Sequence, residues 1–536
     1  MRGAAFGLLA LALLAFAGAS RATDYYACDC ASGAEPGCRP GDDAGAGTSP
    51  GSAWRSYDRL LAEVAGSRCG DSFNFCRGGV FHVPGRSRDW AVAHQDCAAR
   101  PRVVQSYDPG GVSRRPRIEA DGTLFSLNAP GARGIVIRGL DLVCSGTCRA
   151  GVGAILGNVD EVLLDDLLVD GFNVCVQWGT NKKMGVRNST IRNCVNQGLI
   201  GPAGDGSFVI DSRIENNGCL DPAQPCGFSH AHYWNVSDPN ASLVVRNNRY
   251  EGNTRDASRG GACNGNAFVV RGGTRVVVED NVFSTPASPE PLPGCMVVRM
   301  STSLPSHKCT DCAFRRNRIL GGHSLLEVES WIGGVIENNL LFAPRTSVPA
   351  SKTGISLQPS QSGAVASQGL VIRNNSIAMG SSGGGLTSAA IDARHDPRFG
   401  PFGRGLAIVS NSIQMLGDGP NDVCFRFFDD AVVANLVEDY NLCGRLNAKA
   451  RHASTRTALS LEEWRRAHPG QGVHSADADP DFAEPGAPRF DFSLGPRSRA
   501  RDAGDPARSA ATDIRGVARP VGRAPDAGAE ESRAAR

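Results

Sequence analysis

The strings best suited to chemistry lie in the middle of the chain. The most unusual is SHAHYWN (229–235), and the later strings FVVR and MVVR end at Arg271 and Arg299. A histidine or a tyrosine can move a proton, and an arginine can neutralise a carboxylate. These are the needs of β-elimination on a uronic-acid polymer, where the proton to be removed lies next to a carboxylate. We therefore predict His232, Tyr233, Arg271 and Arg299 as catalytic residues.

Two other chemistries are open to these strings. Glu327 and Glu329 in LLEVESW (325–331) could serve a glycoside hydrolase as paired carboxylates. Because they are two residues apart on a strand, their Cα atoms lie about 6.6 Å apart. This spacing does not decide between the two carboxylate geometries of glycoside hydrolases. His230 and His232 are also two apart and would share one side of a strand. No third metal ligand has an obvious place, so no metal site is predicted.

Similar strands can be aligned coil by coil along the chain. Alternation places Val270, Val298, Val328 and Leu357 inward, and it places charged or polar residues outward on a shared face. Long insertions at 217–241, 253–274, 284–312 and 343–368 would wall this face into a groove. The outward set is Arg271, Arg299, Glu327, Glu329, Gln358 and Arg426. Because arginines pair with acidic groups and rings stack on sugars, we predict Trp178, Trp234, Glu327, Glu329, Trp331 and Gln358 as substrate-binding residues. The alternative is an ordinary solvated outer face.

A repeated phrase predicts the elements that carry these residues. Short alternating runs punctuated by asparagine, such as GLVIRNNSIAMG (369–380), recur along the chain. The first four repeats begin about 25 residues apart, and this length is enough for a coil of three short strands and three bends. One coil cannot bury its own apolar face, whereas stacked coils can. The repeats begin at residues 134, 161, 184, 207, 242, 275, 313, 334, 369, 405 and 431.

The asparagines fit the bends of such a solenoid. Asparagine tolerates the left-handed backbone region better than most residues, and stacked asparagines can hydrogen-bond from coil to coil. Helices are excluded because the runs are short, β-branched and interrupted by Gly and Asn. We predict an all-β fold, a single-stranded right-handed parallel β-helix with an N-terminal cap helix.

The N-terminus and the cysteines indicate export. Residues 1–22 have the positive start, apolar core and small-residue cleavage site of a signal peptide, cut near Ala19 or Ala22. Eighteen cysteines, an even number, agree with an oxidising compartment. Local disulfide candidates are Cys144–Cys148, Cys219–Cys226 and Cys424–Cys443, and CTDC (309–312) is better explained by a loop disulfide than by a redox or zinc motif. The protein is expected to be secreted or periplasmic.

Both ends of the mature chain resemble bacterial extracellular pectate-lyase-like proteins. Residues 24–118 match their N-terminal pattern at Trp54, Arg55, Ser56, Gly70, Asp71, Phe75, Arg77, Gly78, Tyr107, Gly110, Arg115, Pro116 and Ile118. The C-terminal segment matches at Ser498, Asp502, Gly504, Asp513, Gly516, Arg519, Pro520, Asp526, Gly528 and Glu531. The resemblance implies a cap over residues 23–98, β-helix repeats over 99–445 and a C-terminal coil or cap segment over 446–536. It specifies architecture, because this superfamily holds lyases, hydrolases, epimerases and proteins without known chemistry.

The sequence thus favours a secreted β-helix protein that acts on or binds an acidic polysaccharide, most simply a polysaccharide lyase. The alternatives are a non-catalytic glycan-binding surface or matrix protein and a glycoside hydrolase. A net charge of +2 gives no hint of nucleic acid or an anionic membrane as partner. A monomer is expected. The cofactor is unknown, and calcium is not indicated by any motif.

Overall fold

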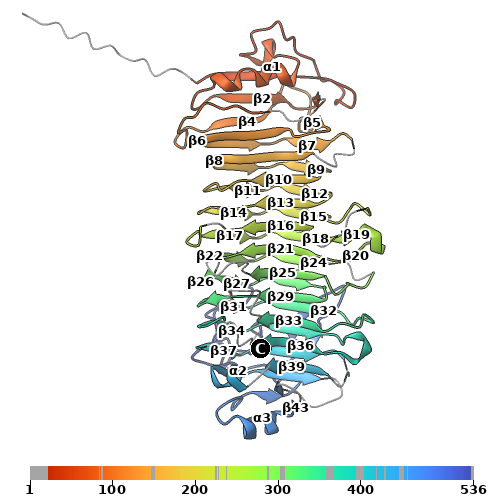
Figure 1. The fold of residues 1–536 in the computed structure, drawn as a ribbon, viewed down its shortest axis with the longest axis vertical. Helices are drawn as coiled ribbons and strands as arrows, with labels where there is room; N and C mark the ends of the chain where they lie inside the picture. The colour runs from red at the N-terminus through yellow and green to blue at the C-terminus, as the bar shows by residue number, and fades with distance from the viewer. Residues whose placement is uncertain are drawn as a thin grey trace, which may run out of the picture.

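A computed structural model describes residues 22–532 except 84, 86–88, 147–150, 224–225, 227–228, 237, 286–288, 302–307, 358–365, 394–403, 418, 420, 428–429, 446–451 and 455–456. Strands of successive coils pair in parallel along one long axis (Figure 1). The predicted fold, an all-β right-handed parallel β-helix, is confirmed. Most of the predicted signal peptide lies outside the described residues. No helix in the described part of the chain is long and apolar enough to cross a membrane.

The stack begins with five strands that pair in chain order within the largest sheet. These are β1 (Asp24–Ala27), β2 (Ser72–Cys76), β4 (Arg102–Tyr107), β6 (Phe125–Arg138) and β8 (Val152–Asp165). The start of β8 pairs with β10 and its end pairs with β11, so two separate ladders continue from this long strand.

Three parallel ladders then form the faces of the β-helix. The first ladder is β10 (Val174–Trp178), β13 (Gln197–Gly201), β16 (His230–Asn235), β21 (Asn266–Arg271), β25 (Met296–Ser301), β29 (Ser324–Val328), β33 (Lys352–Leu357), β36 (Ser388–Ala393), β39 (Asp422–Phe427) and β42 (His452–Ser454). The second ladder is β11 (Gly185–Arg187), β14 (Ser207–Ile210), β17 (Leu243–Arg246), β23 (Val277–Glu279), β27 (Ala313–Arg315), β31 (Val335–Glu337), β34 (Val371–Arg373), β37 (Leu406–Val409) and β40 (Leu436–Asp439).

The third ladder has fourteen strands and also runs the length of the molecule. It is β3 (Val80–Val83), β5 (Arg117–Ala120), β7 (Asp141–Cys144), β9 (Leu168–Asp170), β12 (Thr190–Arg192), β15 (Arg213–Glu215), β18 (Arg249–Glu251), β24 (Val282–Ser284), β28 (Arg318–Leu320), β32 (Leu340–Ala343), β35 (Ser376–Met379), β38 (Ser412–Met415), β41 (Leu442–Arg445) and β44 (Ala476–Asp477). Shorter strands are β19 (Arg255–Asp256), β20 (Ala262–Cys263), β22 (Gly273–Thr274), β26 (Cys309–Thr310), β30 (Trp331–Ile332), β43 (Thr457–Leu459), β45 (Phe482–Glu484) and β46 (Asp491–Leu494).

Apolar side chains stack inside the coils at equivalent positions. Along the first ladder, one inward column is Phe268, Val298, Leu326, Ile355, Ile391 and Phe425, all fully buried. Burying each such side chain contributes roughly 1.5–3 kcal/mol. The predicted inward residues Val270, Val298, Val328 and Leu357 are buried, as expected.

Two consecutive asparagines in a bend have different structural roles. In the bend between β34 and β35, Asn374 adopts a positive φ of 50°, and the next residue, Asn375, points inward. Asn375 donates to the backbone oxygen of Ile336 and to Oδ1 of Asn411, both at 2.9 Å. Asn411 repeats this pattern one coil later with Asn441. The buried ladder predicted from the sequence comprises Asn248, Asn281, Asn317, Asn339, Asn375, Asn411 and Asn441.

Short helices cover both ends of the stack (Figure 1). At the N-terminal end, α1 (Tyr57–Leu61) begins at Ser56, whose side chain accepts a hydrogen bond from the backbone of Arg59. At the other end, α3 (Leu461–Ala467) begins with a capping box and buries Trp464 completely. A third helix, α2 (Asp430–Ala434), lies between β39 and β40. Covering the end of a stack shields strand edges that could otherwise pair with other chains.

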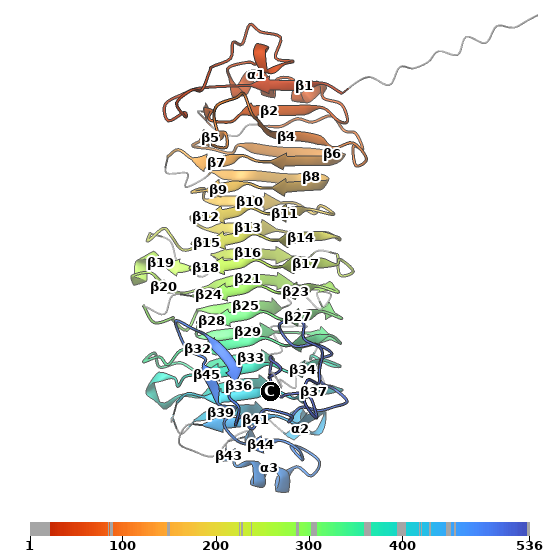
Figure 2. The same cartoon turned by 180° about the vertical axis from the view of Figure 1, so that it is seen from behind.

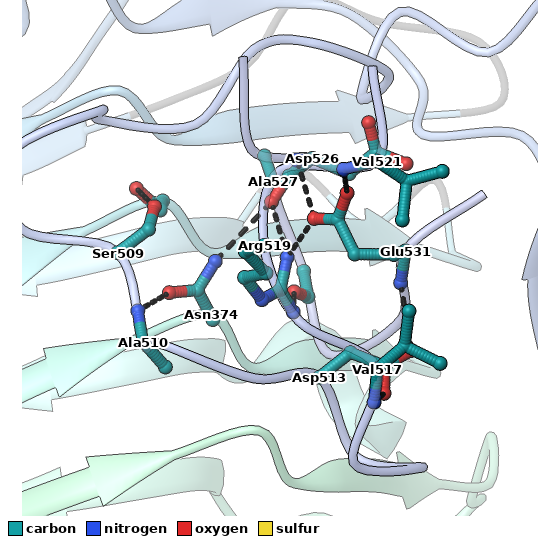
Figure 3. A network of polar contacts seen from close by, with 12 residues as sticks. Asn374, Ser509, Ala510, Asp513, Val517, Arg519, Val521, Asp526, Ala527 and Glu531 are labelled. Carbon is teal, nitrogen blue, oxygen red and sulfur yellow. Dashed lines mark hydrogen bonds and ion pairs between the residues drawn. The ribbon is translucent and has the colours of Figure 1, made fainter. Parts of the chain in front are cut away.

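Residues 479–532 form a C-terminal strap that folds back along the outside of the β-helix (Figure 2). The strap covers outward apolar residues of the third ladder, among them Leu340 and Phe342. It is held by a buried ion pair between Arg519 and Glu531, each 1% exposed (Figure 3). Asn374 also accepts a hydrogen bond from the backbone of Ala510 at 2.8 Å. The strap is thus bonded to the bends it crosses.

All described cysteines are in disulfides. Cys219–Cys226, Cys424–Cys443 and the loop disulfide Cys309–Cys312 form as predicted. Cys144 is disulfide-bonded, while its predicted partner Cys148 lies outside the described residues. The other pairs are Cys28–Cys76, Cys30–Cys38, Cys69–Cys97, Cys175–Cys194 and Cys263–Cys295.

Candidate functional site

A cavity of about 430 Å³ opens on the outer face of the first ladder, where β16, β21 and β25 begin. Its floor includes side chains of those strands, and one wall comes from the loops that precede them. The lining is mostly polar, but it also includes Val269 and Met296. The lining includes Cys226, His230, Asn264, Asn266, Arg271 and Arg299.

Arg271 and Arg299 line this cavity but do not occupy equivalent positions. Arg299 pairs with Val269 across the ladder, and Arg271 pairs with Ser301. Aligning the strings FVVR and MVVR end to end would place Arg271 opposite Arg299. This alignment is wrong by two residues, because the loop between the two strands is longer than the alignment assumes. The parity is unchanged by a shift of two, so both arginines still lie on the outer face.

Arg299 is held by the two glutamates that follow one coil later. Its Nε lies 2.8 Å from Glu327 Oε1, and its Nη2 lies 3.0 Å from Glu329 Oε1. Burial opposes the charge of Arg299, but the two carboxylates outweigh it and raise the guanidinium pKa. Both glutamate side chains are nearly covered, at 9% and 2% exposure. Arg299, Glu327 and Glu329 thus form a network at the cavity edge in which two carboxylates share one guanidinium.

Arg271 makes no ion pair with any residue that the structure describes. Its Nε is buried without a hydrogen-bond partner among those residues. Its guanidinium carbon lies 5.4 Å from the ring centroid of Tyr233, within range of a cation–π contact. Arg271 is therefore a cation in the cavity whose charge is not balanced by a described carboxylate.

His230 is the titratable group beside Arg271. Its imidazole stacks on Tyr233, with ring centroids 5.3 Å apart and planes 11° apart. Burial, then the charges of Arg271 and Arg299, lowers the pKa of His230 to about 4. Its Nδ1 is buried with no hydrogen-bond partner in the described part of the chain. Near neutral pH this ring is uncharged and can accept a proton.

His232 lies in the core, so its prediction as a catalytic base is wrong. Its side chain is fully buried, Nδ1 lies 2.8 Å from the hydroxyl of Tyr250, and burial lowers its pKa to about 3. His230 stacks on Tyr233 although the two are three residues apart, so strict alternation fails at this point of β16. The prediction that His230 and His232 share one side of the strand fails for the same reason.

The predicted tryptophan rim is also wrong. Trp178, Trp234 and Trp331 are 2%, 0% and 0% exposed and pack inside the coils. Trp178 on β10 and Trp234 on β16 lie two coils apart, with β13 between them, and their ring centroids are 5.6 Å apart. They fill volume in the core and cannot stack on an external sugar.

The remaining predicted residues are distributed as follows. Arg271 and Arg299 line the cavity, Tyr233 contacts Arg271, and Glu327 and Glu329 are bound to Arg299. Gln358 lies outside the described residues. Sequence reasoning selected His232 and not His230, although the string HAHY offers either histidine. It did not select Asn266. The outward position of His230 had no signal beyond that ambiguity.

Metal-capable groups are sparse in the described residues. Cys28, Cys38 and Cys76 are the one group of three whose ligand atoms lie close enough together, and all three belong to disulfides. Their sulfurs are therefore not thiolates. Glu327 and Glu329 are already bound to Arg299.

No protein-family model matches the chain, and no curated protein sequence matches it. Among solved structures, pectate lyase Pel9A is 12% identical, with 95% of this chain and 97% of that chain covered and a TM-score of 0.42. The surface adhesin PfbA of Streptococcus pneumoniae is 12% identical over 75% of this chain and 89% of that one, with a TM-score of 0.42. The A-module of the mannuronan C-5 epimerase AlgE4 of Azotobacter vinelandii is 13% identical over 69% and 93%, with a TM-score of 0.43. The fold assignment accordingly rests on the strand pairing itself.

Proposed function

We propose that this protein is an exported polysaccharide lyase that binds an acidic polysaccharide in the cavity at β16, β21 and β25. The observation that carries the proposal is the unbalanced Arg271 beside the neutral imidazole of His230. An arginine in that state favours a carboxylate-bearing sugar, because its planar fork can bind both oxygens. Eight described disulfides favour an oxidising compartment.

The chemistry follows from the positions of three side chains. Arg271 binds the uronate carboxylate and stabilises the charge that develops on it. His230 accepts the proton from the carbon next to that carboxylate. A carbon–carbon double bond then forms, the glycosidic carbon–oxygen bond breaks, and the Tyr233 hydroxyl gives its proton to the leaving oxygen. Proton exchange with water restores His230 and Tyr233. The stack of His230 on Tyr233 holds the acceptor and the donor side by side.

Hydrolysis by Glu327 and Glu329 is less favoured. A glycosidase needs two carboxylates that flank the bond and differ in protonation. Here both carboxylates contact the same guanidinium and are nearly covered. Arg299 would therefore have to be displaced before either one reached a sugar.

A non-catalytic glycan-binding protein is the second candidate. It is favoured by the same unbalanced Arg271, because binding an acidic sugar needs that cation whether or not elimination follows. The two candidates differ in whether His230 matters for turnover. We expect the protein to act as a monomer, and the described residues do not indicate a calcium requirement.

The test is incubation of the full mature chain with a panel of uronic-acid polymers and neutral polymers. Unsaturated products are detected by their ultraviolet absorbance, and new reducing ends are measured in parallel. We expect absorbance and reducing ends to rise together on one acidic polymer, and to be abolished in His230→Ala. Reducing ends without absorbance would support the hydrolase. Binding without either signal would support the glycan-binding protein.

A further inference from the structure

The wall of the cavity is built from residues at or next to two disulfides. Cys226 lines the cavity itself and is bonded to Cys219. Asn264 follows Cys263, and Gly294 precedes Cys295, the partner of Cys263. Both disulfides therefore end at the cavity wall that faces His230 and Arg271.

Asn264 joins the two cross-linked loops. Its backbone oxygen contacts the sulfurs of Cys219 and Cys226 at 3.5 and 2.7 Å. Its side-chain Nδ2 donates to Asp256 Oδ2 at 2.8 Å. A Cβ placed on Gly294 would lie 2.2 Å from Asn264 Oδ1, so the second loop packs closely against the first. The wall is one continuous unit of contacts.

These loops contain little strand structure, and besides the disulfides they are held by single backbone hydrogen bonds, such as those that Leu220 donates to Val195 and Thr254 donates to Asn217. Within 217–229 no strand is described, and 252–265 holds only the two-residue strands β19 and β20. The disulfide Cys263–Cys295 closes a separation of 32 residues, so it removes considerable freedom from the chain between its ends. Loops without strand pairing open at low free-energy cost unless they are cross-linked.

We propose that Cys219–Cys226 and Cys263–Cys295 are positioning disulfides of the glycan site, which hold the wall that makes the site competent only after oxidation. The inference rests on the proposed function for the identity of the ligand, an acidic sugar bound at Arg271. The wall leaves His230 and Arg271 only partly exposed to solvent. Without it, the cavity becomes an open surface on which an arginine binds a carboxylate weakly, because water screens the pair. The protein therefore acquires its binding site in an oxidising compartment.

Two double variants of the full mature chain test the inference, C219A/C226A and C263A/C295A. The matched control is C424A/C443A, which removes a buried disulfide between β39 and β41, in coils remote from the cavity. The readout that needs no substrate is the rate at which diethyl pyrocarbonate modifies His230, mapped by peptide mass spectrometry. We expect about a fivefold faster reaction in the two loop variants, and the parent rate in the control, because preorganisation of the wall is lost. Equal rates in all four proteins overturn the inference.

Activity supplies the second readout. On a polymer that the parent cleaves, each loop variant should raise KM about tenfold with a smaller change in kcat, since the wall does not touch the reacting atoms. A KM equal to that of the parent overturns the inference even if His230 reacts faster. If the parent cleaves no polymer while His230 becomes more reactive, the proposed function fails and the role of the disulfides stands.

Gly294→Ala tests the same inference without removing a disulfide, in case the cysteine variants misfold. It keeps both disulfides and pushes Asn264 away from its position. The same direction of change in His230 reactivity and in KM is expected. Parent values in this variant, together with folded but unaffected double variants, would overturn the inference.

Discussion

His230 stacks on Tyr233 with ring centroids 5.3 Å apart and planes only 11° apart. The guanidinium carbon of Arg271 lies 5.4 Å from the centroid of the same Tyr233 ring. His230 and Arg271 therefore line one cavity, and the ring of Tyr233 contacts both of them. Of the residues predicted as catalytic from the sequence, Arg271 and Arg299 line this cavity and Tyr233 contacts Arg271, whereas His232 is buried in the core.

The activity should depend on pH through His230. Its pKa is lowered to about 4, so the neutral base is present above that pH and is lost as pH falls through it. On the cleaved polymer, kcat/KM should fall only below about pH 4–5. The Arg271 charge contributes to this lowering, so the residual activity of Arg271→Gln should show the inflection at higher pH. An inflection of the parent near the ordinary histidine pKa, about 6.5, would contradict the assignment.

Buried histidines should also make the fold sensitive to acid. Burial lowers the pKa of His232 to about 3 and, with smaller contributions from its neighbours, that of His323 to about 4. As pH falls, these histidines are protonated in the unfolded chain before they are protonated in the folded one. Their contribution to the free energy of unfolding is therefore fully present above about pH 6.5 and decreases as pH falls towards 4. Between about pH 7 and 4.5, His232 should account for roughly 3 kcal/mol of that loss.

The comparison for this loss is His232→Leu combined with Tyr250→Phe, which removes the titrating group together with its hydrogen-bond partner. Chemical unfolding of both proteins at the two pH values gives the difference. The account requires a smaller loss in the double variant. An identical loss would assign the acid sensitivity to other groups.

The asparagine ladder should be important for stability. Asn375→Ala would remove donors to Ile336 and Asn411 and acceptors for two groups of Asn339. A buried group left unsatisfied costs about 1–3 kcal/mol, so a total near 3 kcal/mol or more is expected. Asn247→Gly is the control, because that residue holds a positive φ of 54° that glycine also adopts. Equal thermal midpoints of the two variants would remove the ladder from the account of stability.

The C-terminal strap should depend on its buried ion pair. Arg519→Met leaves Glu531 charged in a site where its side chain is 1% exposed, which costs about 3–5 kcal/mol. Faster tryptic cleavage within 479–532 is the expected signal, since detachment exposes the strap. Arg519→Met combined with Glu531→Leu should recover most of the protection. A double variant cleaved as fast as the single one would show that the charge imbalance is not the cause.

The fold was predictable because its signal is local and repeated. Asparagine recurs at the bends that follow β17, β23, β27, β31, β34, β37 and β40, and the coils repeat the inward apolar positions that bury Val298 and Val328. Errors arose where a prediction needed absolute alignment between coils. The two-residue offset of Arg271 from Arg299 is set by the length of an irregular loop, which strand periodicity does not encode.

Side-chain direction near the strand ends was the second source of error. Strict alternation does not hold in β16, where His230 and Tyr233 lie on one face and His232 and Trp234 on the other. Tryptophan was predicted at the edge of the groove because its ring can stack on a sugar, although its size suits the core equally well. The cavity wall depends on a disulfide between residues 32 apart, and such a pairing is not fixed by sequence.

The central claim is that the cavity recognises an acidic sugar through Arg271. Its most direct test is the equilibrium affinity of the parent and Arg271→Gln for uronate oligosaccharides and for neutral oligosaccharides of equal length. The control Arg213→Gln removes an exposed arginine of the third ladder, 55% exposed and paired with Glu215. We expect uronate binding by the parent, a loss of about tenfold to hundredfold in Arg271→Gln with an unchanged thermal midpoint, and parent affinity in the control. Undiminished uronate binding by Arg271→Gln would contradict the account.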